Sequence, residues 1–406
     1  MSEMSAKISV IIPTYWTSIN SAIQQQVPDA IYDHPTPLEK QSTLPRLLNS
    51  LRSTDLPRES TTITVIVAVA HRVLEEKAEE KTREIISDYK NTFDIIQFSA
   101  STLRKINSIN RDLATLFDLY GYSNIRNTGL AIAQILRSDI IVFLDDDVIV
   151  DDENYFHKAQ EFAGKKVDDK LLGGIAGYYV NKSGKYYLDI DPKAWWKIGW
   201  PKEEKMNEAF KVIESRQRLT ETTFAFGGNM VLHWKMFEKV PFDPYITRGE
   251  DMDLLANAKM FGFKFMLDTK LQVLHLPGEK KRLWSEMRQD LYRFFYMRQK
   301  LLYNRNIKDI RSVSINSLEP YLGYFLHLGM CLKFAISNCL NSFHSISEGD
   351  FESSKEHLRN VSQIPSALQF AKKHGLEYFR FQKKWSNYMP KIRNDKGLKN
   401  ILERSA

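Results

Sequence analysis

The sequence is poor in cysteine and has no long apolar run. Its 406 residues contain two cysteines, Cys331 and Cys339, which are too few for a disulfide framework and do not form a metal-ligand pattern. We therefore expect a reducing, cytoplasmic compartment. No run of about 18 uninterrupted apolar residues occurs, and residues 1–8 carry Glu3 and no apolar core. We expect neither a transmembrane helix nor a signal peptide.

The chain is basic, with a net charge of +7 and a pI near 9.0. A basic chain favours an anionic partner such as nucleotide phosphates, an acidic glycan or a membrane surface, and the charge does not choose among them. Residues 321–340 are the most membrane-like segment. We interpret them as a buried or amphipathic helix, with contact to a membrane surface as the alternative.

Strand and helix patterns alternate along the first half of the chain. Short β-branched runs at 7–13, 62–70, 93–98 and 140–144 predict strands, and helical spacing appears at 43–51, 73–90 and 124–136. This alternation predicts an α/β fold with a mainly parallel central sheet flanked by helices. Further strands are predicted at 173–180, 224–233, 263–268 and 271–276.

The texture of the sequence changes near residue 280, where long, basic and aromatic helical patterns begin. We expect an α/β domain over residues 1–280 and a mainly helical, basic region over residues 281–406. The sequence contains no internal repeat.

The apolar run Ile140–Leu144 passes directly into Asp145, Asp146 and Asp147. A buried strand that ends in acid places the acids at the carboxyl edge of the sheet, where open α/β sheets bind ligands. A divalent cation would remove the repulsion among adjacent carboxylates and hold an anionic substrate. The alternative is an acidic loop that caps the next helix, and this stretch alone does not decide between them.

Several blocks, taken in order, resemble the family 2 glycosyltransferases. The similarity covers roughly residues 7 to 280 and rests on Ile11–Tyr15, Arg126–Leu130, Leu144–Asp147, Gly227–Met230, Arg248–Leu254 and Leu274-His275. The resemblance implies a GT-A nucleotide-sugar fold. It also implies an enzyme that moves a sugar from a UDP- or GDP-sugar to an acceptor hydroxyl in glycan or glycoconjugate synthesis.

The resemblance also assigns roles to residues. It implies donor-binding roles for Pro13, Thr14, Tyr15, Arg126, Asn127, Asp145, Asp146, Gly227, Gly228 and Asn229. The DxD motif would bind Mn²⁺ or Mg²⁺ through Asp147, with Asp145 reaching metal-bound water or the ribose and His275 adding an imidazole. In an extended segment Asp145 and Asp147 share one face, and Asp146 points away.

The expected catalytic residues are Asp251 and its neighbour Glu250. In inverting relatives the aspartate of this block is the general base; in a retaining enzyme Asp251 need not be a base, and the sequence leaves the two outcomes open. Acids in the first turn of a helix also favour its dipole, which is the structural alternative for Glu250, Asp251 and Asp253.

One position departs from the family pattern. Relatives carry an acidic loop after the second strand that contacts the nucleotide base, whereas here the chain reads Ala68-Val69-Ala70-His71-Arg72. The base contact is therefore in doubt, and His71 or Arg72 could replace it. His71 as a plain surface residue is the alternative.

The expected partners are a nucleotide-sugar donor and a carbohydrate or lipid-linked acceptor, and no nucleic acid. Peripheral contact with the inner face of a membrane is left open. The rival interpretation is a non-catalytic binding or scaffold protein that docks on a membrane or partner through its basic helical tail. A nucleotidyltransferase is disfavoured because Pro13-Thr14-Tyr15 offers no Gly-rich, basic phosphate loop.

Overall fold

The structure is a computed structural model that describes residues 6–20, 32–109, 115–276 and 282–405. Its strands are β1 (Ile8–Thr17), β2 (Thr36–Pro37), β3 (Thr61–Val69), β4 (Asp94–Phe98), β5 (Ile140–Leu144), β6 (Val148–Ile149), β7 (Lys166–Val167), β8 (Lys170–Val180), β9 (Leu219–Glu221), β10 (Asn229–His233) and β11 (Lys264–His275).

The helices up to residue 276 are α2 (Leu44–Leu51), α3 (Glu75–Ser87), α4 (Ala100–Ile109), α6 (Tyr122–Ile135), α7 (Tyr155–Glu161), α8 (Lys202–Phe210), α9 (Trp234–Phe237) and α10 (Glu250–Met260). The later helices are α11 (Leu283–Asn304), α12 (Gly323–Leu326), α13 (Met330–Ser347), α14 (Phe351–Ser362), α15 (Ile364–His374), α16 (Glu377–Ile392) and α17 (Lys396–Glu403). The 3-10 turns are η1 (Arg58–Ser60), η2 (Arg72–Leu74), η3 (Trp195–Lys197), η4 (Lys211–Glu214) and η5 (Ile315–Leu318).

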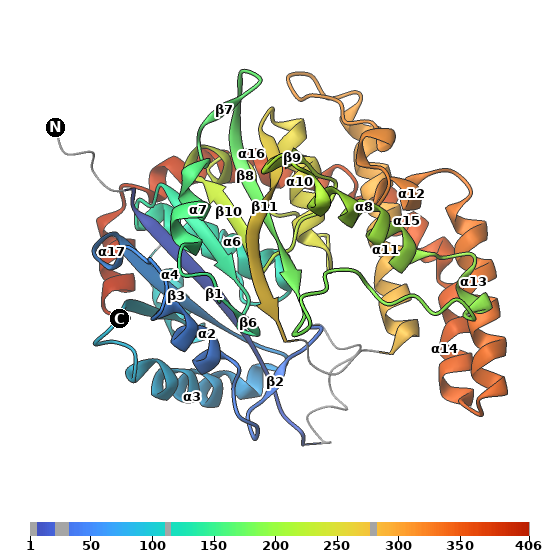
Figure 1. Cartoon of the computed structure of the whole chain (residues 1–406), viewed down its shortest axis with the longest axis horizontal. Coiled ribbons are helices and arrows are strands. Elements are labelled where there is room, and N and C mark those ends of the chain that lie inside the picture. Colours follow the sequence, from blue (N-terminus) through green and yellow to red (C-terminus); the bar gives the residue numbers. More distant parts are fainter. Residues whose placement is uncertain (1–5, 21–31, 110–114, 277–281, 406) are drawn as a thin grey trace.

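The central sheet has the strand order β4-β3-β1-β5-β10-β8-β11-β6 (Figure 1). The four strands from β4 to β5 are mutually parallel, β10 runs antiparallel to both β5 and β8, and β11 is parallel to β8. Helices cover the sheet, and further helices follow it in the chain. The predicted α/β fold, with a mainly parallel sheet and a C-terminal helical region, is confirmed.

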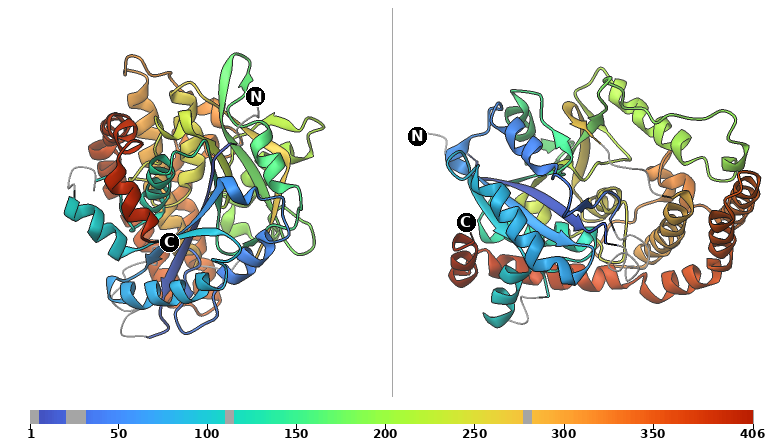
Figure 2. Two further views of the ribbon diagram at one scale, coloured as in Figure 1. Left: turned by 90° about the vertical axis from the view of Figure 1, so that its left-hand side faces the viewer. Right: turned by 90° about the horizontal axis from the view of Figure 1, so that it is seen from below.

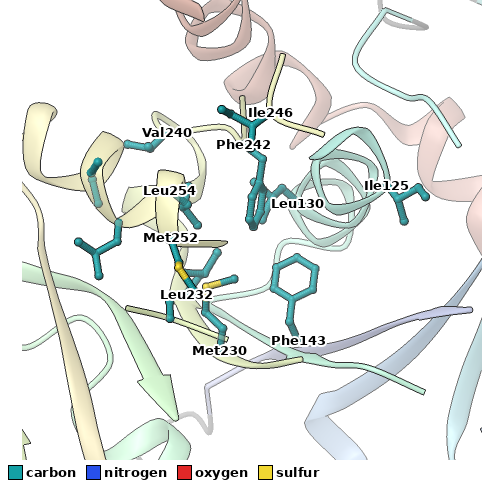
Figure 3. Close-up of a cluster of buried hydrophobic side chains, with 14 of the residues drawn as sticks. Ile125, Leu130, Phe143, Met230, Leu232, Val240, Phe242, Ile246, Met252 and Leu254 are labelled. Carbon is teal, nitrogen blue, oxygen red and sulfur yellow. The ribbon is translucent and has the colours of Figure 1, made fainter. Parts of the chain in front are cut away.

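Strand β5 is buried on both faces, as its unbroken apolar run predicts. Ile140, Val142 and Leu144 join the hydrophobic cluster that includes side chains of α2, α3 and α7. Ile141 and Phe143 join the cluster that includes side chains of α6, α10 and α16, part of which Figure 3 shows. The alternation follows from the two-residue period of a strand.

Three predicted strands have different bounds in the structure. The strands predicted at 263–268 and 271–276 form the single strand β11 (Lys264–His275), which stays in the sheet across an irregularity between Leu267 and Gln272. The strand predicted at 224–233 begins only at Asn229, because a turn closed by the Asn229 N–H and the Phe226 carbonyl (3.0 Å) precedes it. This turn places residues 227–228 outside the strand.

The helix predicted at 321–340 is interrupted in the structure. Helix α12 ends at Leu326, and Gly329, with a φ of +93°, precedes α13. Glycine adopts this left-handed conformation without the steric cost that a Cβ would bring. No helix in the described part of the chain has the length and apolarity needed to cross a membrane.

The C-terminal helices return to the sheet. The Gln134 side chain of α6 donates to the Met389 carbonyl of α16 (3.0 Å), and the Trp385 indole donates to the Phe237 carbonyl (2.9 Å). Residues on both sides of position 280 therefore share one hydrophobic cluster. The predicted domain boundary itself lies in 277–281, outside the described residues. Helices α13 and α14 lie at the opposite end of the molecule from α17 (Figures 1 and 2).

Candidate active site

Arg126 joins three of the segments that the sequence singled out. Its buried guanidinium donates from Nε to Glu250 Oε1 (2.9 Å), from Nη1 to the Gly227 carbonyl (2.9 Å) and from Nη2 to Asp145 Oδ1 (3.0 Å). Burial lowers the pKa of Arg126, but the carboxylates around it outweigh burial, and the net pKa is raised. The structure thus brings helix α6, the loop after β5 and the start of α10 to one point.

The three acids after β5 separate in space. Asp145 faces α6 and accepts a hydrogen bond from Arg126. The guanidinium carbon of Arg126 also lies 5.3 Å from the centroid of the Phe143 ring. Asp146 is buried beside Thr43 at the start of α2, and burial together with its acidic neighbours raises its pKa. That environment disfavours a charged Asp146. Asp147 lies against the end of β11 instead.

Asp147 and His275 form a pair at the carboxyl edge of the sheet. Asp147 Oδ2 lies 3.3 Å from His275 Nε2, while Asp147 Oδ1 is buried without a hydrogen-bond partner. Burial lowers the pKa of His275, but the hydrogen bond and the charge of Asp147 outweigh it, so the net pKa is raised. A buried carboxylate oxygen without a partner is costly, and a cation would remove that cost.

Within the described residues, no group of three or more His, Cys, Asp or Glu side chains is arranged to hold a metal ion. Asp147 and His275 therefore offer an incomplete ligand set. Mg²⁺ and Mn²⁺ accept such a set, because they are commonly bound through one or two protein ligands together with water and substrate phosphates. The residues present fit a cation that a diphosphate helps to hold.

An aromatic stack supports this pair. The Tyr179 ring lies between His275 (centroids 4.6 Å apart, 19°) and Phe226 (4.4 Å, 20°). The Tyr179 hydroxyl donates to Asp145 Oδ2 (3.2 Å) and accepts from the Gly228 N–H (2.9 Å). Tyr179 links both halves of the acidic site. The sequence reasoning missed its role, because the signal was only a tyrosine at the end of a predicted strand.

Two glycines let the loop before β10 approach the acids. A Cβ on Gly227 would lie 2.3 Å from Arg126 Nη2, and a Cβ on Gly228 would lie 2.4 Å from the Asp145 carboxyl. Such distances leave no room for a side chain at either position. The glycines therefore allow the backbone to lie directly against the Arg126 and Asp145 side chains.

Each acid at the start of α10 has a different partner. Glu250 is buried against Arg126. Asp251 is only partly buried; its Oδ2 accepts from the Gly227 N–H (2.8 Å) and its Oδ1 from the Met252 N–H (2.7 Å). Burial and the charge of Glu250, opposed by Arg126, raise the pKa of Asp251 to about 7. Of the two predicted catalytic acids, Asp251 is therefore the more exposed and is close to half-protonated near neutrality.

Asp253 belongs to a buried ion network that the sequence did not reveal. Lys300 of α11 donates to Asp253 Oδ1 (2.6 Å) and to Asp243 Oδ2 (2.8 Å), and all three side chains are fully buried. The network ties α11 to α10 and to the segment before it. Asp253, the third acid at the start of α10, therefore has a structural role in this network and none in catalysis.

Three of the predicted donor-binding residues bond to the scaffold. Asn127 donates to the Phe242 carbonyl (2.9 Å) and accepts from the Phe242 N–H (2.8 Å). Asn229, fully buried, donates to the carbonyls of Tyr178 and Leu271. Thr14 donates to a carbonyl of the neighbouring strand. The side chains of these residues are used to hold strands and loops together.

Strand β1 delivers Tyr15 to the site, while Pro13 is buried within the same strand. The Tyr15 ring packs on Tyr32 (4.6 Å) and Tyr122 (5.1 Å), and its hydroxyl is buried without a hydrogen-bond partner. Burial raises the pKa of Tyr15, with Arg126 opposing. His71 accepts a hydrogen bond from the Val73 N–H (3.4 Å) and caps η2.

No family model and no curated protein matches the chain. Among solved structures, the chain is similar to the mannosyltransferase PcManGT from Pyrobaculum calidifontis in complex with GDP-Man and Mn²⁺, at 12% identity over 92% of this chain and 88% of that chain, with a TM-score of 0.47. It is also similar to residues 1–349 of S. aureus TarS, at 12% identity over 88% of this chain and 91% of that chain, with a TM-score of 0.45. At these values neither similarity assigns a function to the chain.

Proposed function

We propose that the chain is a metal-dependent glycosyltransferase of the GT-A type that uses a nucleotide-diphosphate sugar, with UDP- and GDP-sugars both open as donors. The observation that carries the proposal is the Asp147–His275 pair, with its unpartnered Asp147 oxygen, next to the Arg126-centred carboxylates at the carboxyl edge of β5. The family resemblance in the sequence points the same way.

Asp147 and His275 would hold Mn²⁺ or Mg²⁺, and Asp145 would contact the ribose or metal-bound water. A bound cation supplies Lewis-acid stabilisation of the departing diphosphate. An imidazole ligand suits Mn²⁺ better than Mg²⁺. His275 must be neutral to bind a cation, so its raised pKa predicts that cation binding would weaken as the pH falls.

Asp251 is the proposed base for an inverting reaction. The acceptor oxygen bonds to the anomeric carbon, the bond from that carbon to the diphosphate oxygen breaks, and the hydroxyl proton passes to Asp251. A base with a pKa of about 7 is matched to this work near neutral pH. If the enzyme retains configuration, Asp251 need not be a base, and its role is to accept the hydrogen bonds of the Gly227 and Met252 N–H groups.

A thermal-shift and calorimetry panel tests the metal and donor together. UDP, GDP and their common sugar derivatives are added with and without Mn²⁺. We expect a metal-dependent shift with at least one nucleotide, and we expect Asp147→Ala to weaken Mn²⁺-dependent nucleotide binding by about 100-fold or more, since even residues that only support metal ligands contribute about 10–100-fold.

The matched control is Asp151→Ala, which removes an exposed acid four residues further along the chain and should leave binding unchanged. Donor hydrolysis and transfer that persist in Asp147→Ala with Mn²⁺ present would show the metal assignment to be wrong. A panel with no metal-dependent shift for any donor would instead support the non-catalytic scaffold.

A further inference from the structure

The buried face of helix α13 is largely polar. Beside Met330 and Phe334 it carries the buried polar side chains Ser337, Asn338, Asn341 and Ser342. These side chains bond to neighbouring elements: Asn338 to His357 and Ser342 to Ser354, both of α14. The opposite face is apolar and faces water.

The exposed face is a continuous apolar stripe formed by Leu332, Ile336, Cys339, Phe343 and Ile346. The exposed fractions are 66% for Leu332, 45% for Ile336, 66% for Phe343 and 47% for Ile346, and Cys339 is half-buried. Steps of four and three residues keep these side chains on one side of a helix. Large contiguous apolar patches are rare on monomers and mark interaction sites.

Neighbouring elements add exposed apolar side chains at this end of the molecule. The η3 segment lies against α13, where the Trp196 ring stacks on His344 (3.5 Å) and the Asn341 amide donates to the Trp196 carbonyl (3.2 Å). Next to Trp196, Ile198 is 74% exposed, and Phe351 at the start of α14 is 71% exposed. The surface is at the end of the molecule that carries α13 and α14 (Figures 1 and 2).

The spacing of the stripe is symmetric about Cys339 to within one residue. Leu332 and Ile346 lie seven residues to either side of Cys339, and Ile336 and Phe343 lie three and four residues away. Two copies of α13 laid antiparallel therefore place Leu332 against Ile346 and Ile336 against Phe343. Isologous, two-fold pairing requires such self-complementarity.

The charge of the α13–α14 hairpin favours a protein partner over an anionic membrane. Residues 328–362 hold three basic side chains, Lys333, Lys355 and Arg359, against four acidic ones, Glu348, Asp350, Glu352 and Glu356. A bilayer surface attracts clustered lysine and arginine, which this hairpin lacks. In the antiparallel arrangement Lys333 of one copy, whose ammonium donates to the Tyr324 hydroxyl (3.2 Å), lies about one helical turn along the axis from Glu348 of the other.

We propose that α13 pairs antiparallel with α13 of a second copy of this chain, around a two-fold axis near Cys339. The stripe then packs as a helix-to-helix seam of the 3-4 type. The inference is independent of the proposed enzymatic activity.

The first test is the oligomeric state of the full chain by analytical ultracentrifugation at micromolar concentration. We expect a dimer for the wild-type chain and a monomer for Phe343→Glu, with Leu332→Glu as the second variant. Leu368→Glu, which changes an exposed leucine of α15 outside the stripe, should remain a dimer. Because Phe343 and Leu332 are largely exposed, both variants should keep the far-UV circular dichroism spectrum of the wild-type chain and a cooperative melting transition, which shows that they are folded.

Cross-linking tests the geometry. In a Cys331→Ser, Cys339→Ser background, a short bis-maleimide should join a chain carrying Leu332→Cys to one carrying Ile346→Cys. It should not join two Leu332→Cys chains, whose cysteines lie about 21 Å apart along an antiparallel pair. In the Cys331→Ser chain, the same reagent should join Cys339 of one copy to Cys339 of the other.

Three results would overturn the proposal: a monomeric wild-type chain, a dimer that Phe343→Glu leaves intact, or efficient cross-linking between two Leu332→Cys chains. A monomer that co-sediments with anionic vesicles through the stripe would show that lipid covers this face instead.

Discussion

Replacing Arg126 with methionine tests whether this guanidinium holds the acidic site together. Methionine keeps much of the apolar stem and removes the charge, so Glu250 loses its ionic partner. The Glu250 side chain is 6% exposed, and leaving a buried charge without its partner costs about 3–5 kcal/mol. The Asp145 side chain is 25% exposed, and water therefore screens most of the destabilisation that would come from the loss of the Arg126–Asp145 ion pair. We therefore expect a loss of about 3 kcal/mol, set by Glu250.

For a chain of 406 residues that unfolds as one unit, about 3 kcal/mol lowers the melting temperature by about 3 to 4 °C. Differential scanning calorimetry measures this shift. The control is Arg83→Met, which breaks an ion pair of similar length (2.8 Å) whose arginine is 60% exposed; it should cost less than about 1 kcal/mol.

The loss should also depend on pH. Without Arg126, the folded chain takes up protons on its buried carboxylates more readily than the unfolded chain does, so the stability of the variant falls as pH rises. The gap between variant and wild type should therefore narrow from about pH 8 to about pH 5. A shift below about 1 °C for Arg126→Met, or a gap that widens on acidification, would refute the reasoning.

Three further predictions concern neighbouring residues. Activity should rise with pH through the Asp251 pKa of about 7, because a base must be unprotonated. In a steady-state assay, Asp251→Asn should lose this rise in activity with pH and should lower the rate by about 10²–10⁴-fold. Transfer by Asp251→Asn within a few-fold of the wild-type rate would exclude Asp251 as the base. Tyr179→Phe keeps the stack on His275 and removes the hydrogen bonds to Asp145 and from the Gly228 N–H, so donor KM should rise by about tenfold, while the melting temperature should fall by only about 1 to 3 °C; an unchanged KM would remove Tyr179 from the site. Lys300→Met should cost about 3–5 kcal/mol in calorimetry, because it strands two buried carboxylates; a loss under about 1 kcal/mol would show that the network is not needed.

Much of the fold follows from local patterns in the sequence. The run Ile140–Leu144 predicts a strand buried on both faces, and the two hydrophobic clusters on either side of β5 confirm it. Alternation of helices and strands predicts the parallel part of the sheet in the same way. The strand predicted at 224–233 was too long at its start, because the two glycines form a turn that hydrophobicity does not reveal.

The site required long-range information. Arg126 and Glu250 are 124 residues apart in the chain, and nothing in either local sequence states that they pair. The acids at 250, 251 and 253 look alike as a helix start, yet one bonds Arg126, one bonds the Gly227 N–H and one bonds Lys300. Their pKa values and uses depend on burial and partners, which only folding brings together.

The sequence by itself determined the buried strands and the acids at the end of β5, because hydrophobic period and residue type are local properties. Only the tertiary structure decided which face of α13 is buried: its polar face packs inward through Asn338 and Ser342, and the apolar stripe is left to water. Helical spacing shows which residues share a face of the helix. Residues far away in the chain, which pack against one of these faces, decide which face is buried.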